Sequence, residues 1–176
     1  RLFLIIALGE TILTTGAAIA TAPMTLMTVA TGAAALAGTV ALWSLGFGRA
    51  GRLVLQYVEE TRDPVRASIS VMNTLMAMVA GLIAVAVSNE LVIAHQNGHP
   101  STMLSLLLFG GPILFLLAQS WHYWFVLKLR PRLDLIGSAA LLLIGFATLT
   151  APPYVALILV GASLSTLAIL DERMAK

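Results

Sequence analysis

The chain has 176 residues, of which 59% are hydrophobic and only 10% are charged, and its formal net charge is +2. Soluble domains carry about 25% charged residues, so a water-soluble fold of this length could not cover its surface with so few charges. The absence of cysteine excludes disulfide frameworks, thiolate metal sites and cysteine nucleophiles. Composition therefore predicts an integral membrane protein, and so small a net charge does not indicate binding to nucleic acid.

Six long apolar segments follow one another along the chain. A transmembrane helix needs about 20 mostly apolar residues, and a helix satisfies its own backbone hydrogen bonds inside lipid. The segments are apolar on every side, whereas the strands of a membrane barrel alternate apolar and polar residues. We therefore predict one all-α, polytopic transmembrane helix bundle over residues 1–176. The six predicted helices cover residues 2–21, 24–47, 67–94, 102–127, 133–150 and 154–170.

All ten Lys and Arg residues lie on one side of this pattern. They occupy the two ends of the chain and the links that follow the second and fourth segments, while the other three links carry none. Cationic loops resist translocation, so we predict that both termini are cytoplasmic. The ten cations are Arg1, Arg49, Arg52, Arg62, Arg66, Lys128, Arg130, Arg132, Arg173 and Lys176.

The chain starts without methionine, directly inside an apolar run. We interpret it as a fragment of a longer protein, and we expect upstream helices of the same protein to pack against it as partners, alongside the lipid bilayer. Whether the fragment folds without those helices is left open at this point.

Local patterns add detail to the segments in chain order. The small residues of Gly32–Gly38 predict a close helix contact, as does the seven-residue spacing of two glycines in the first segment, Gly9 and Gly16. The link at 48–63 is predicted to hold a short amphipathic helix on the inner membrane surface, and the third long helix should start at Pro64. The next paragraphs along the chain concern its polar residues.

Two neutral or aromatic features mark the inner half of the fourth segment. Gln119 is a polar side chain at membrane depth, where a hydrogen bond to a neighbouring helix is the default expectation. The run Trp121–Phe125 lies next to Lys128 and Arg130, which is typical of an aromatic belt at the inner interface.

Glu10 is the most informative acidic residue, because it lies nine residues into the first segment. That position is about 13 Å deep, close to the membrane midplane, where a charged carboxylate costs about 2.5–3.5 kcal/mol on insertion scales. It must be protonated, paired, or facing a polar cavity, and Thr14 lies one turn along on the same face. We predict a proton or cation site in a transport path, with a protonated acid bonded between helices as the structural alternative.

Glu90 and His95 lie near the outer end of the third segment. Five residues separate them, so they do not share one helical face, and Gly98 and Pro100 indicate that the helix ends nearby. An acid at the outer mouth beside a titrating histidine, a metal site that includes His99, and plain polar capping all remain open. Our predicted transport or proton site comprises Glu10, Thr14, Glu90 and His95, with no catalytic residue, no metal and no cofactor.

Three stretches carry ordered motifs: Leu4–Ile12, Val79–His95 and Gly110–Pro112. They resemble, respectively, the IxLGES, MVAGIVAxAVGDELVxAHP and GGPxLxLL patterns of the bacterial low temperature requirement protein A family. The resemblance implies the C-terminal half of a longer multi-pass protein in the bacterial plasma membrane. The family's name records a growth phenotype in the cold, so the resemblance implies no particular reaction.

One departure from the family pattern concerns the outer end of the third segment. Ser88 and Asn89 stand where Gly and Asp are usual, which removes one carboxylate beside Glu90. A mechanism that needs two adjacent acids there would not apply to this chain.

Three functions remain after this reading, in order of preference. The first is a transporter or permease for a small solute or ion, and the second is a non-transporting membrane component for growth or envelope adaptation at low temperature. The third, an intramembrane enzyme, needs Glu90, His95 and His99 to converge. The chain lacks a P-loop, a dinucleotide fingerprint, a zinc-protease pair and a nucleophile elbow, so we expect that it is not an enzyme.

Overall fold

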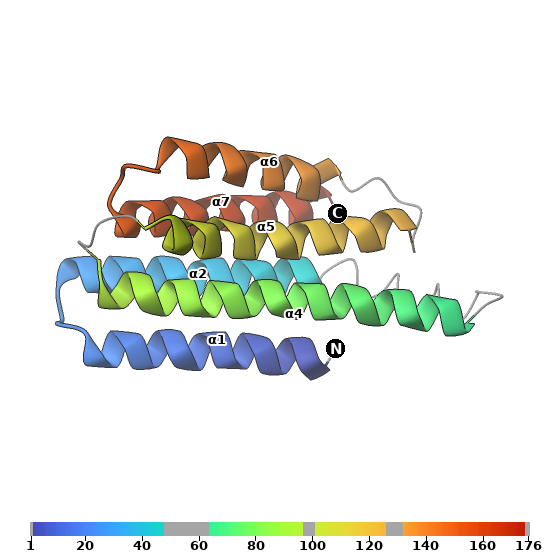
Figure 1. Ribbon diagram of the computed structural model, residues 1–176, viewed down its shortest axis with the longest axis horizontal. Coiled ribbons are helices and arrows are strands. Elements are labelled where there is room, and N and C mark those ends of the chain that lie inside the picture. The colour runs from blue at the N-terminus through green and yellow to red at the C-terminus, as the bar shows by residue number, and fades with distance from the viewer. Residues whose placement is uncertain (1, 48–63, 97–100, 126–131, 175–176) are drawn as a thin grey trace.

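A computed structural model describes residues 2–47, 64–96, 101–125 and 132–174. All regular structure in these ranges is helical, and the helices run alternately in opposite directions, with the N- and C-terminal ends at the same end of the bundle (Figure 1). The prediction of an all-α bundle with six helices is confirmed. The helices are α1 (Leu2–Thr21), α2 (Leu26–Phe47), α4 (Pro64–Ala94), α5 (Thr102–Phe125), α6 (Arg132–Ala147) and α7 (Pro153–Met174).

Five of these helices are long and apolar enough to cross a membrane: α1, α2, α4, α5 and α7. The sixth, α6, has 16 residues, which corresponds to about 24 Å of helix and is shorter than the hydrocarbon core. It ends early because the amide of Ala151 bonds the carbonyl of Thr148 in a tight turn. Large apolar side chains such as Leu143 and Phe146 face outward, which places the bundle in a lipid bilayer.

Prolines and hydroxyl side chains set several helix starts. Both α4 and α7 begin at a proline, which suits the first helical position because proline has no backbone N–H to leave unpaired. At the start of α5 the amide of Leu104 donates to the Ser101 hydroxyl at 3.1 Å, a helix cap. The start of α4 at Pro64 agrees with the prediction, whereas the amphipathic helix predicted at 48–63 lies outside the described residues.

Glycines let two pairs of helices approach closely. A Cβ atom added to Gly81 of α4 would lie 2.7 Å from the carbonyl oxygen of Gly111 of α5, so the two backbones nearly touch. In the same way a Cβ atom added to Gly161 of α7 would lie 2.5 Å from the carbonyl oxygen of Ala34 of α2. Small residues favour such contacts in lipid, so the close packing predicted for Gly32–Gly38 is confirmed for its Ala34 and Gly38 side.

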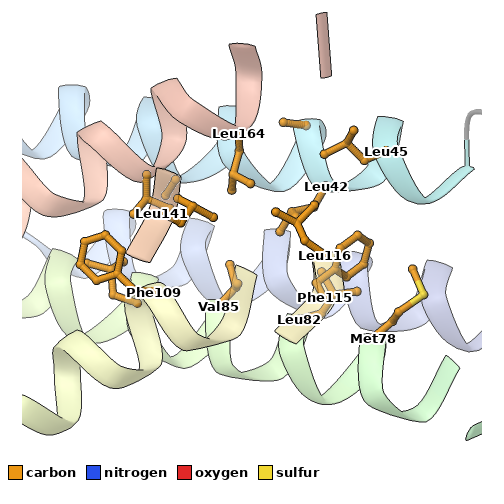
Figure 2. Packing of buried hydrophobic residues seen from close by; sticks show 14 of the residues in the cluster. Leu42, Leu45, Met78, Leu82, Val85, Phe109, Phe115, Leu116, Leu141 and Leu164 are labelled. Carbon is orange, nitrogen blue, oxygen red and sulfur yellow. The ribbon is translucent and has the colours of Figure 1, made fainter. Parts of the chain in front are cut away.

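The core lies where α2, α4, α5 and α7 converge. Phe115 and Leu116 of α5, Leu82 of α4 and Leu42 of α2 have no exposed surface, and Figure 2 shows their side chains gathered in one cluster. The ring of Phe115 also covers Gly46 of α2, whose added Cβ atom would lie 3.1 Å from Phe115 Cζ. By contrast α1 lies at one edge of the bundle (Figure 1), beside α4 and α2, and only 22% of its span is buried.

The interhelical hydrogen bond predicted for Gln119 is confirmed. Its side-chain nitrogen donates to the backbone carbonyl of Leu45 on α2 at 3.0 Å, and the glutamine is 3% exposed. This bond satisfies one of the last carbonyls of α2, which have no partner within their own helix.

We expect the substitution Gln119→Leu to lower the free energy of unfolding by about 1 kcal/mol, because the Leu45 carbonyl would lose its donor in a buried position. Equilibrium unfolding of the full-length protein in mixed micelles would measure the change. Asn73→Leu is the matched control, because it removes the same group from an exposed position on α4. Equal losses for the two variants would contradict the proposed role of the Gln119 bond.

Candidate functional site

Three of the four predicted site residues line one groove on the outer side of the bundle. The groove lies between α1 and α4, has a volume of about 390 Å³, and is lined by Glu10, Thr14 and Glu90 together with apolar side chains. The sequence predicted each acid separately, and the structure brings the two carboxyl-bearing residues into a single site.

The order of the lining residues gives the arrangement of the site. Because α1 and α4 run in the same direction (Figure 1), the groove climbs both helices together. Ile83 of α4 is followed by Val87 and then Glu90, just as Ala7 of α1 is followed by Glu10 and then Thr14. Glu90 therefore lies level with Thr14 and about one turn, or roughly 5 Å, further out than Glu10.

Glu10 faces away from the bundle centre. It is exposed, whereas Leu8 and Thr11 beside it are 4% and 0% exposed and point into the core. Thr14 donates its hydroxyl to the carbonyl of Glu10 at 2.9 Å, so the threonine contacts the backbone of Glu10 and leaves the carboxyl group to the groove. Both carboxylates therefore lie on a wall that is otherwise apolar.

A second groove continues the first toward the inner end of the bundle. It is lined by residues from Ser68 to Ile83 of α4 and by Phe3 of α1, and its volume is about 610 Å³. The two grooves share Phe3, Val79 and Ile83, so they form one furrow along the α1–α4 side. The inner part is apolar and the outer part carries the two acids.

His95 lies apart from this furrow. It follows the last residue of α4, is exposed, and does not line the groove that holds Glu90. The described residues contain no group of three or more His, Asp or Glu side chains that could hold a metal ion. His99, the other histidine considered for that site, lies outside the described residues.

The close contact predicted from Gly9 and Gly16 is wrong for the described bundle. A Cβ atom added to either glycine would have no neighbour within 4 Å, so no described helix packs there. The reason is the orientation of α1, which uses Leu4, Leu8 and Thr11 to contact the rest of the bundle.

The sequence reading missed the polar residues of the interior. Asn89 is 2% exposed, and its side-chain nitrogen has no hydrogen-bond partner. At the inner end, His122 and Asp134 are 7% and 6% exposed, and each has one side-chain atom without a partner. The aromatic run had predicted an interfacial His122, yet only its neighbours Trp121 and Trp124 face outward, because the four residues turn around α5.

These features define the class of the protein. Apolar helices that cross a bilayer, an exterior of large apolar side chains and a polar interior make it a multi-pass α-helical membrane protein. A family model described as bacterial low temperature requirement A protein (LtrA) matches residues 1–169, so the chain belongs to the LtrA family. The resemblance of its motifs is thereby confirmed. No match was found among curated proteins or among solved structures.

Proposed function

We propose that this LtrA-family protein moves a small solute or ion across the bacterial plasma membrane, and that it is not an enzyme. Glu10 is the proton or cation site in this proposal, and Glu90 is its neighbour toward the outer mouth. The supporting observation is that the two acids, predicted from separate motifs, line one groove between α1 and α4.

Electrostatics favours a cation or a proton as the species that occupies the site. Glu10 is the ninth residue of a 20-residue membrane helix, so its carboxyl group lies near the midplane. A second acid about one turn away adds repulsion, which is strong where little water screens it. A bound cation or proton removes both costs, and intramembrane acids commonly serve this role. His95 lies beyond the groove, and we propose that it contacts solute only at the outer surface.

One observation favours the second function, a non-transporting membrane component. The groove opens to the outside of the bundle, and the outward face of α1 carries large apolar side chains such as Ile6 and Leu13, 66% and 69% exposed. A helix of another protein, or of the same protein, could cover this face and pair with Glu10 without any transport.

A flux measurement decides between the two functions. The full-length protein is reconstituted in lipid vesicles that contain a pH-sensitive dye or, in parallel, a sodium-sensitive dye, and a potassium gradient with valinomycin sets the membrane potential. We expect Glu10→Gln to lower the protein-dependent proton or sodium flux at least about tenfold, equivalent to about 1.4 kcal/mol in a barrier. Glu90→Gln should lower it in the same direction.

Glu172→Gln is the matched control for these variants. Glu172 is an exposed acid near the inner end of α7, where it accepts a hydrogen bond from Ser44 at 3.3 Å, and it does not line the groove. Its flux should equal that of the wild type. A flux no larger than that of protein-free vesicles, or one unchanged by both groove substitutions, would favour the non-transporting function instead.

A further inference from the structure

A small cavity lies at the centre of the bundle, on the opposite side of α4 from the acidic groove. It is lined by residues of α2, α4, α5 and α7, and it leaves about 10 Å³ of space. Val85 of α4 and Leu164 of α7, which project into the core in Figure 2, form part of its wall. Space of about 10–15 Å³ is enough for one water molecule where polar partners are present.

The cavity wall contains a buried donor without a partner. Asn89 lines the cavity and is 2% exposed, and its side-chain nitrogen makes no hydrogen bond to the protein. An unpaired buried amide costs about 1–3 kcal/mol, so the position calls for an acceptor. The other buried carboxamide at membrane depth, Gln119, has such an acceptor in the Leu45 carbonyl.

Two acceptors belong to residues of the same wall. Ser88 donates its hydroxyl hydrogen to the carbonyl of Val85 at 2.9 Å, which leaves the lone pairs of its oxygen free to accept. Pro112 lies inside α5 and has no N–H, so the carbonyl of Leu108, four residues earlier, lacks its usual helical donor. Ser88, Leu108 and Pro112 all line the cavity.

We propose that this cavity is a binding site for one water molecule, held by the amide of Asn89 as donor and by Ser88 and Leu108 as acceptors. A water molecule both accepts and donates, so it satisfies all three groups, and about three hydrogen bonds are usual for a buried water. The described side chains that line the site are neutral, so nothing in its wall selects a charged ligand. This site is independent of the transport proposal, because the acidic groove lies on the other side of α4.

Solid-state NMR of the full-length protein in bilayers tests the proposal directly. Magnetisation is transferred from water protons to side-chain amide groups, and the Asn89 signal is identified by its loss in Asn89→Asp. We expect transfer to Asn89 to be severalfold faster than transfer to Gln119, which is equally buried but bonded to protein. Equal, slow transfer to both amides would overturn the proposal.

Two conservative variants separate a bound water from general wetting of the interior. Ser88→Ala removes one acceptor, and Pro112→Ala restores a backbone donor for the Leu108 carbonyl. Each should slow the transfer to Asn89 without changing that to Gln119. Rapid transfer that neither variant alters would show water that is not held by these groups and would also overturn the assignment.

Discussion

Replacing Gly111 with alanine should lower the stability of the bundle by about 1–3 kcal/mol, the usual cost of an overpacked core. The added Cβ atom would lie 2.9 Å from the carbonyl oxygen of Gly81 and 3.0 Å from the backbone nitrogen of Val85. Backbone atoms of a packed helix cannot turn aside as a side chain can. The helices α4 and α5 would therefore have to separate along their whole contact.

The neighbouring residue supplies the control. A Cβ atom added to Gly110 meets nothing within 4 Å, so Gly110→Ala should be neutral, or stabilising by up to about 1 kcal/mol because alanine favours helix over glycine. Unfolding of the full-length protein in mixed micelles of mild detergent and dodecyl sulfate would give both values. A loss of similar size at Gly110 would mean that the close approach of α4 and α5 is not the cause.

Phe115→Ala should be the most damaging truncation of an apolar side chain. Phe115 has no exposed surface and lies where α2, α4 and α5 meet, against Gly46 and beside Gly81. Lipid is as apolar as the core, so the loss comes from the cavity and its missing contacts rather than from exposure to water. We expect about 3 kcal/mol, the lower end of the range for Phe→Ala in soluble cores.

Phe146→Ala is the corresponding control on α6, where the phenylalanine is 73% exposed toward lipid. The same atoms are removed there without leaving a cavity, so we expect a change within about 0.5 kcal/mol. The same micelle unfolding assay compares the two variants. If Phe146→Ala cost as much as Phe115→Ala, the measured loss would reflect transfer of the ring and not packing.

The secondary structure could be predicted well because the membrane imposes a simple rule. Long apolar segments interrupted by prolines and cations predict helices, and Pro64 and Pro153 do begin α4 and α7. The arrangement of the helices could not be predicted in the same way. Every face of such a helix is apolar, so the pattern does not show that α1 lies at the edge with Glu10 facing outward.

The candidate site shows the same division. Glu10 and Glu90 could be found from the sequence because an acid is rare in an apolar segment. Their common groove depends on the parallel packing of α1 and α4, which helices far apart in the chain do not announce. Asn89 drew little attention because it is neutral and lies next to Glu90, although it is the residue that faces the interior.

Asn89 and Glu90 are joined by one peptide bond, and one residue turns the helix by about 100°. Asn89 therefore borders the central cavity while Glu90 borders the outer groove. The helix α4 acts as a partition about 10 Å thick between two separate compartments. An acid introduced at position 89 would not join Glu90 in one site, and substitutions at these two neighbouring positions report on two different places in the molecule.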